Sequence, residues 1–197
     1  MCSRQRNYSG LLIAGAALFL LAAASPVSAQ CLCDNTPGCA QTIIGTSGND
    51  TLYGSSVAND CMYGLAGNDT IFSYGGNDHI DGGPGDDASL TGGPGNDCVC
   101  GYDGDDSLSG GDGVDVLDGL NGNDWITGGS MADTLYGYYG FDVLRGDNGN
   151  DSLFGEGDDN DLNGGAQNTG AADSCDGGFG VDRCTQCEIV NSCEIIY

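Results

Sequence analysis

The chain has 197 residues, of which 37 are glycine, and Asp and Glu outnumber Lys and Arg by 29 to 4. Its length suits one domain. The strongly negative charge excludes nucleic-acid binding, because contacts to phosphate need a cationic face. It also makes a compact state self-repelling, so the acids must be neutralised before the chain can fold.

Residues 1–29 have the pattern of a secretory signal peptide. Arg4 and Arg6 precede an apolar run over residues 11–24, and small residues stand at Val27 and Ala29. The run has about 14 residues, fewer than the ~20 that span a bilayer, so no membrane span is expected. We expect export and cleavage after Ala29. Cleavage removes two basic residues and no acid, which leaves 29 acidic and 2 basic residues and a charge of −27.

Ten cysteines follow the expected cleavage site: Cys31, Cys33, Cys39, Cys61, Cys98, Cys100, Cys175, Cys184, Cys187 and Cys193. An even number in an exported chain predicts disulfides. The first three indicate a Cys-rich N-terminal cap over residues 30–44. The last four indicate, over residues 164–197, degenerate repeats and a Cys-rich C-terminal cap; such caps would cover exposed strand edges. The spacing of Cys184 and Cys187 is also that of half a zinc site, and this alternative stays open.

Residues 45–163 repeat an aspartate every nine or ten residues. Glycines usually stand two and five residues before the aspartate, and an aliphatic residue stands two after it, as in GTSGNDTLYG at 45–54. Segments such as TLY at 51–53 alternate polar and apolar residues, which predicts a very short strand with one inward side chain. The six residues between strands must turn sharply. Glycine supplies the positive φ angles for such turns. The turn glycines two before the acid are Gly48, Gly67, Gly76, Gly85, Gly95, Gly104, Gly113, Gly122, Gly140 and Gly149.

Two strands and two turns would close one coil about every eighteen residues. We therefore expect an all-β fold, a right-handed parallel β-roll (a β-helix solenoid) with two facing ladders of aliphatic side chains as a thin core. Only one copy slips, with Leu90 beside the expected inward position. Cys61 and Cys98 would lie two coils apart, ~9.6 Å on the strand spacing, and are not expected to pair.

Stacking the coils sorts the recurring acids into two rows. The Asp50 row contains Asp50, Asp69, Asp87, Asp106, Asp124 and Asp142 and continues to Asn160. The Asp60 row contains Asp60, Asp78, Asp97, Asp115, Asp133 and Asp151. After a four-residue insertion, two degenerate copies place Asp173 and Asp182.

Carboxylates one strand spacing apart repel strongly unless a cation lies between them. An oxygen-only cage of carboxylates and turn carbonyls suits calcium better than magnesium. The twelve aspartates of the two rows are therefore candidate calcium ligands, and the gaps between neighbours could hold about 8–11 ions. We expect the weakest sites at Asp60, whose turn lacks both glycines, at Asp133, which follows Met131, and at the uncharged Asn160.

The segments GGPGNDCVCG, GGDGVDVLDG and GTSGNDTLYG resemble the G-G-x-G-x-D-x-U-x motif of the repeats-in-toxin (RTX, hemolysin-type calcium-binding repeat) family. The resemblance covers roughly residues 45–184. It implies that the first six residues of each copy form the calcium turn and the last three the strand. It also implies that calcium is held between neighbouring coils by the motif aspartates and backbone carbonyls. Members of that family avoid cysteine and use a one-step exporter, whereas this chain's signal peptide and cysteines favour the general secretory route.

No residue pattern indicates catalysis. His79 is the only histidine and is expected to be a solvated strand residue, and no serine lies in a nucleophile context. We therefore expect a secreted calcium-binding protein, not an enzyme, whose folding is driven by Ca²⁺. The alternative is a calcium-rigidified adhesin with a cell-surface or glycan partner, in which Tyr102, Trp125, Tyr138, Tyr139 and Phe141 form a contact patch. A toxin or secreted-enzyme accessory is a further alternative.

Overall fold

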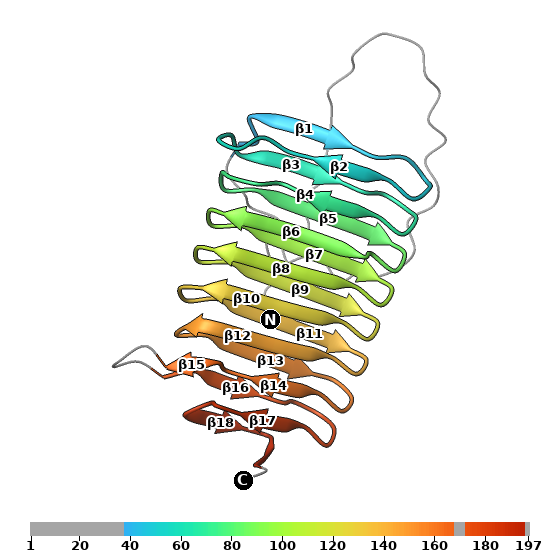
Figure 1. The fold of residues 1–197 in the computed structure, drawn as a ribbon. Helices are drawn as coiled ribbons and strands as arrows, with labels where there is room; N and C mark the ends of the chain where they lie inside the picture. The colour runs from blue at the N-terminus through green and yellow to red at the C-terminus, as the bar shows by residue number, and fades with distance from the viewer. Residues whose placement is uncertain (1–37, 168–171, 196–197) are drawn as a thin grey trace, which may run out of the picture.

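The computed structural model describes residues 38–167 and 172–195, so the expected signal peptide and the first part of the expected N-terminal cap lie outside it. All regular structure in the described residues is β-strand. The strands alternate between two parallel sheets, and two successive strands make one coil of a stack (Figure 1). This confirms the predicted β-solenoid of nonapeptide repeats. Within the described ranges, no helix is long and apolar enough to cross a membrane.

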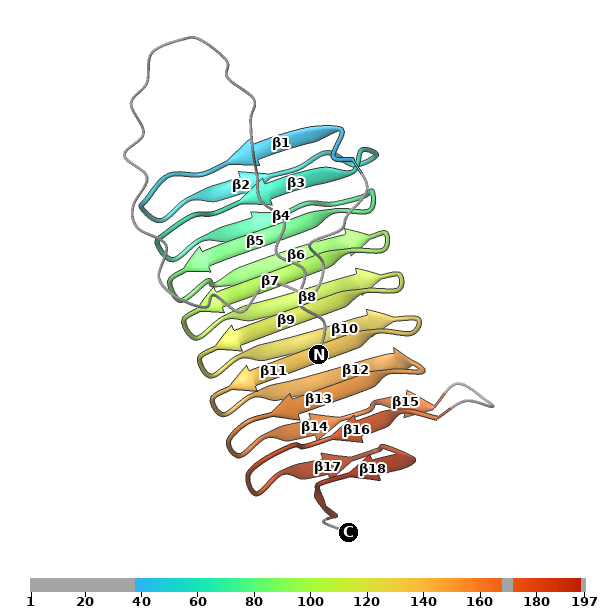
Figure 2. The same ribbon diagram turned by 180° about the vertical axis from the view of Figure 1, so that it is seen from behind.

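The two sheets face each other along the whole stack (Figure 2). The first sheet contains β1 (Gln41–Ile44), β3 (Asp60–Tyr63), β5 (His79–Pro84), β7 (Cys98–Asp103), β9 (Val116–Asn121), β11 (Thr134–Tyr139), β13 (Ser152–Glu156), β16 (Ser174–Asp176) and β18 (Ile189–Asn191). The second contains β2 (Thr51–Tyr53), β4 (Thr70–Phe72), β6 (Ser89–Pro94), β8 (Ser107–Asp112), β10 (Trp125–Ser130), β12 (Val143–Gly149), β14 (Asp161–Asn163), β17 (Arg183–Thr185) and β19 (Glu194–Ile195), with β15 (Ala166–Gln167) beside β12.

The central strands are longer than the three-residue strands expected from the sequence. Strand β5, for example, has six residues and extends through Gly82, Gly83 and Pro84 into the following turn. The reason is the exact repetition of the backbone from coil to coil. Gly83 pairs with Tyr102 and Pro84 with Asp103 of the next coil, so parallel pairing continues through the first half of the turn. Three-residue strands remain towards the ends, as in β2 and β14.

One inward side chain from each strand builds the core, as predicted. The fully buried members are Met62, Ile71, Ile80, Leu90, Val99, Leu108, Leu117, Ile126, Leu135, Leu144, Leu153 and Leu162. Leu90 pairs with Ile71 and Leu108, so the ten-residue copy absorbs its extra residue before the strand begins. Each side chain therefore packs mainly on the ladder members above and below it, and no single coil has a core of its own.

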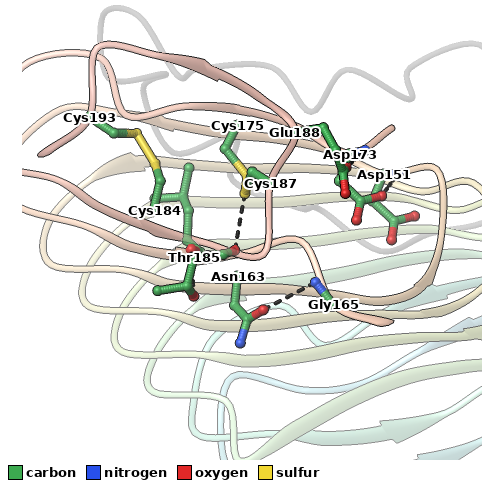
Figure 3. The surroundings of a disulfide bond; sticks show 11 residues. Asp151, Asn163, Gly165, Asp173, Cys175, Cys184, Thr185, Cys187, Glu188 and Cys193 are labelled. Carbon is green, nitrogen blue, oxygen red and sulfur yellow. Dashed lines mark hydrogen bonds between the residues drawn. A yellow bond between two sulfur atoms is a disulfide. The ribbon is translucent and has the colours of Figure 1, made fainter. Parts of the chain in front are cut away.

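Disulfides replace the aliphatic ladders in the last coils (Figure 3). Cys175 pairs in register with Leu153 and Cys184 with Leu162, so both cysteines occupy core positions. Cys175 is bonded to Cys187 and Cys184 to Cys193, with Cα–Cα distances of 6.0 and 5.9 Å. Cys184 and Cys187 are both disulfide-bonded, to different partners, so neither has a thiolate to bind zinc. The alternative of a zinc site at these two cysteines is therefore wrong.

A further disulfide joins Cys39, just before β1, to Cys61 in β3. Cys61 therefore does not pair with Cys98, which confirms the prediction. Cys98 and Cys100 are both disulfide-bonded and lie on the outer side of β7, where they pack with Tyr102 outside the aliphatic core. The three bonds above use every other described cysteine. By the count of cysteines in the sequence, Cys2, Cys31 and Cys33 are not used in these three bonds.

We predict that Cys31 and Cys33 are bonded to Cys98 and Cys100 in the mature chain, because cleavage after Ala29 removes Cys2. Cys61 and Cys98 are two strand pairings apart, ~9.6 Å, and the six residues from Cys33 to the bonded Cys39 can span ~20 Å. Unreduced protein, denatured and cut before aspartates, should release residues 30–33 linked to residues 97–102 by mass spectrometry. The fragments linked through Cys175–Cys187 and Cys184–Cys193 serve as the control. A free thiol at Cys98 or Cys100 would contradict the prediction.

Candidate metal centre

The recurring aspartates stack in two rows, one ahead of each sheet. Members of the Asp60 row lie at the start of strands of the first sheet, and members of the Asp50 row precede strands of the second. Neighbours in a row belong to adjacent coils. Thr134, which follows Asp133, pairs with Val116 after Asp115 and with Ser152 after Asp151. The fold therefore places the expected ligands one strand spacing apart, ~4.8 Å.

Each aspartate is tied to the next by a backbone hydrogen bond. The N–H of Asp115 donates to Oδ1 of Asp133, and the N–H of Asp133 donates to Oδ1 of Asp151, both at 2.9 Å. The same bond runs from Asp106 to Asp124 in the other row, at 2.9 Å. From the second copy of each row onward, one carboxylate oxygen is thus fixed by the preceding coil, and the carboxylates stack in register.

The residue before the acid forms a bond in the opposite direction. Asn77 Oδ1 accepts a hydrogen bond from Asn96 N–H at 3.0 Å, and Asn123 Oδ1 accepts one from Phe141 N–H at 2.9 Å. Asp105 accepts in the same way from Asn123 N–H, at 2.8 Å. A short side chain with an oxygen therefore braces each turn against the next coil, which explains why Asn and Asp are frequent at this position.

The second carboxylate oxygen has no hydrogen-bond partner in most copies. An unpartnered, buried Oδ2 occurs in Asp69, Asp78, Asp87, Asp97, Asp106, Asp115, Asp124, Asp133, Asp142, Asp151 and Asp182. These residues are at most 3% exposed. Burying an ionised oxygen without a partner is costly, so each copy must take up either a proton or a cation.

Backbone carbonyls share the space around this oxygen. A Cβ atom placed on Gly128 would lie 2.6 Å from Oδ2 of Asp133 and 3.0 Å from the carbonyl oxygen of Gly146 in the next coil. A Cβ on Gly82 would overlap Oδ2 of Asp87. Because the first residue of the turn is a glycine, the space that a Cβ would fill is bordered by the carboxylate Oδ2 and by the carbonyl oxygen of the next coil.

The expected turn glycines lie at the other tight point of the turn. Gly85 has a φ of 149°, and a Cβ there would overlap the carbonyl of Gly67 in the preceding coil. Gly67, Gly76, Gly95, Gly104, Gly113, Gly122 and Gly140 have positive φ as well. Gly48 and Gly149 are not in this φ region, although a Cβ on Gly149 would overlap the carbonyl of Met131. Met131 itself replaces a turn glycine and keeps a positive φ of 83°.

Burial raises the pKa of these carboxyl groups. The pKa of Asp106 and Asp133 is raised to about 8, and that of Asp97, Asp124 and Asp142 to about 7. Burial is the largest cause; the hydrogen bond from the neighbouring backbone N–H lowers the pKa, and repulsion from nearby carboxylates raises it. Around neutral pH and without a cation, Asp106 and Asp133 would therefore hold protons for most of the time.

The first copy of each row differs from the rest. Oδ2 of Asp50 accepts hydrogen bonds from the N–H and hydroxyl of Thr46, at 2.5 and 2.8 Å. Oδ2 of Asp60 accepts one from the N–H of Ser55 at 2.6 Å. Protein donors therefore already contact the oxygen that is unpartnered elsewhere, but in Asp60 the other oxygen, Oδ1, is buried without a partner. Asp133, by contrast, keeps an unpartnered Oδ2 despite the preceding Met131.

Both rows continue beyond the regular repeats. Asp151 N–H donates to Oδ1 of Asp173 and Asn160 N–H to Oδ1 of Asp182, both at 2.9 Å. Asp173 N–H then donates to Oε2 of Glu188 at 2.8 Å (Figure 3). Sequence reasoning missed Glu188, because it follows Asp173 by fifteen residues and not eighteen. The only signal was an acid placed directly before the apolar pair Ile189–Val190.

The donor set fits calcium, which takes six to eight carboxylate and carbonyl oxygens. Within the described residues, no three His, Cys, Asp or Glu side chains gather at one point, so carbonyls would have to complete each site. His79 does not belong to either row. Its ring packs edge-on against Tyr63, with centroids 5.9 Å apart.

A protein-family model described as the RTX calcium-binding nonapeptide repeat (4 copies) matches residues 40–56, 58–88, 89–108, 101–135 and 136–170. The matched ranges include both rows from Asp50 to Asn160, in agreement with the resemblance seen in the motifs. A search of curated proteins gave no match.

The raised pKa values predict that acid stabilises the metal-free roll. Burial raises the pKa of Asp106 and Asp133 to about 8 in the folded chain, from an ordinary value of 3.8. Between these values the folded state binds more protons than the unfolded state, so the free energy of unfolding falls as the pH rises. Circular dichroism melts in metal-stripped buffer should give a Tm that decreases from about pH 4.5 to pH 8.

Saturating calcium should reverse this trend, because protons compete with the metal for the same oxygens. The matched series therefore uses the same buffers with calcium added. Metal-stripped buffer is preferable to a chelator, whose own calcium affinity changes with pH. A metal-free Tm that rises with pH over this range would contradict the prediction.

Proposed function

Because the chain belongs to the RTX calcium-binding nonapeptide repeat family, we propose that it is a secreted calcium-binding β-roll protein whose folding is driven by Ca²⁺ between stacked turns. One observation carries the proposal. In two parallel rows, most of the buried carboxylates have an oxygen without a hydrogen-bond partner, and this oxygen lies near a turn carbonyl of the next coil.

The proposed ligands are the row aspartates together with turn carbonyls. The backbone N–H of the preceding coil holds Oδ1 and so orients the carboxylate, while Oδ2 and carbonyls such as that of Gly146 face the site. Bound calcium would supply the positive charge that these oxygens lack. Asp50 would bind most weakly, because the N–H and the hydroxyl of Thr46 already donate to its Oδ2.

Electrostatics explains why folding would depend on the metal. Two carboxylates ~4.8 Å apart repel by about 3 kcal/mol at an effective dielectric constant of ~20. Each row repeats this pair from coil to coil, and the mature chain would carry a charge of −27. About ten calcium ions would cancel most of that charge, so the binding free energy becomes folding free energy.

Export is the part of the proposal that rests on the sequence and on the cysteines. The signal-peptide pattern of residues 1–29 supports secretion, and the disulfides support an oxidising compartment. The proposal assigns no catalytic residue, since the rows and the core account for most of the repeated positions. It includes about 8–11 calcium ions as the ligands.

The proposal predicts that residues 30–197 are expanded without calcium at pH 8, where the row carboxylates are largely ionised, and compact with calcium. Far-UV circular dichroism and gel filtration of the oxidised protein should show a gain of β signal and a smaller hydrodynamic radius on adding millimolar calcium. Magnesium at the same concentration is the control and should have little effect, because it prefers a tighter octahedral site. A second series with reduced cysteines separates the metal from the disulfides. An unchanged β signal after calcium removal in both series would refute the proposal.

A surface-interaction role is the second candidate, and exposed aromatic residues favour it. Trp125, Tyr139 and Phe141 are 49%, 66% and 52% exposed. Phe141 N–H bonds to Asn123, two residues before Trp125, so these rings lie along the edge of the Asp50 row. Exposed apolar groups gathered at one edge are typical of contact surfaces. Tyr102 lies elsewhere, against Cys98 and Cys100.

If this edge binds a glycan or cell-surface partner, Trp125→Ala should weaken calcium-dependent retention on a glycan array or on cells at least several-fold. Tyr53→Ala is the matched control, because Tyr53 is 56% exposed but lies in β2, four strands away in the same sheet. Circular dichroism in calcium verifies that both variants fold. Equal retention of Trp125→Ala and the unchanged protein would remove this candidate.

A further inference from the structure

We infer that Asn160 is a built-in calcium-free position in the Asp50 row, where the side-chain amide takes the place of the cation. The inference rests on the proposed function and deepens it, because it assigns which gap in the row the metal skips. It starts from the hydrogen bonds of one buried side chain, 1% exposed.

Asn160 is a regular member of its row by its backbone and by its Oδ1. Oδ1 accepts a hydrogen bond from Asp142 N–H at 2.8 Å, as a carboxylate Oδ1 does elsewhere. Its own N–H donates to Oδ1 of Asp182 at 2.9 Å. Because Oδ1 must accept from an N–H, the other end of the amide is the nitrogen.

The amide nitrogen occupies the place of the unpartnered carboxylate oxygen. A Cβ on Gly155 would lie 2.7 Å from Nδ2 of Asn160 and 2.7 Å from the carbonyl of Gly177 in the next coil. The matching distances from Gly128 are 2.6 Å to Oδ2 of Asp133 and 3.0 Å to the carbonyl of Gly146. The two copies therefore share one geometry, with nitrogen in place of oxygen.

The hydrogens of Asn160 Nδ2 point at turn carbonyls. Nδ2 donates to the carbonyl of Gly157 at 2.9 Å and lies 3.5 Å from that of Asp158, the third and fourth residues of the turn. At an aspartate position the same carbonyls would face an anionic oxygen, and only a cation or a proton could bridge them. At Asn160 the amide bridges them, and its hydrogens would repel an incoming cation.

Asn160 interrupts the row before its last member, Asp182, whose Oδ2 is again buried without a partner. Asn160 is the last regular copy before the insertion and before the coils that hold Cys175–Cys187 and Cys184–Cys193. The neutral side chain of Asn160 has its own hydrogen-bond partners, so this coil needs no metal to stack. The disulfides stabilise the coils that follow. The gap between Asn160 and Asp182 is thus a boundary between the two means of stabilisation.

The test is a gain of one ion. Bound calcium per chain is counted at saturation by equilibrium dialysis and elemental analysis for the unchanged protein, Asn160→Asp and Asn150→Asp. Asn150→Asp is the matched control, because it adds the same charge at an exposed position in the preceding turn. We expect one additional ion in Asn160→Asp and none in Asn150→Asp. The same count in Asn160→Asp and the unchanged protein would overturn the inference.

The reverse substitution, Asp124→Asn, keeps the test decisive if Asn160→Asp does not fold. Its new amide should donate to the carbonyls of Asn121 and Gly122, so the variant should fold in calcium and bind one ion fewer. An undiminished count in Asp124→Asn would overturn the inference. Absence of bound calcium in the unchanged protein is a separate outcome: it would overturn the proposed function, and this inference with it.

Discussion

The fold depends on stacked carboxylates that are each held by one oxygen and left unpartnered at the other. The backbone N–H of one coil grips Oδ1 of the next, as between Asp115 and Asp133, and this bond fixes the stacking. The same bond buries Oδ2 against carbonyls with no donor in reach. The bond that sets the register of the coils therefore also brings buried carboxylates together, so the chain cannot stack without this electrostatic cost.

This constraint explains why the spacing of the repeat can vary while its register does not. Successive acids linked by the same N–H bond are 18, 19, 22 or 15 residues apart, yet each pairs in register. The acid and the inward aliphatic residue set the register, and the turn absorbs the extra residues, as it does before Leu90. The oppositely directed bond from residues such as Asn77 and Asn123 prevents neighbouring turns from sliding.

The sequence was sufficient to predict the features that repeat. Phase alone identified the two aliphatic ladders and the two rows of acids, because a side-chain period shared by many copies can be satisfied only by stacking. Features that depend on a neighbouring coil were not predictable. The six-residue strands arise only when Gly83 and Pro84 find partners one coil away. The donors from Thr46 and Ser55 lie within the turns of their own acids, and no feature of the repeat indicated them.

Glu188 and the disulfides lie where the repeat loses its phase, and pattern reasoning fails there for a physical reason. A terminal coil has a neighbour on one side only, so a row of acids cannot close a cation site beyond it. Glu188 ends the Asp60 row with an oxygen from a longer side chain, and next to it Cys187 is bonded to the core position of Cys175. At the other end, Cys61 follows Asp60 directly and is bonded to Cys39. The disulfides Cys39–Cys61, Cys175–Cys187 and Cys184–Cys193 thus stand where the rows of carboxylates run out.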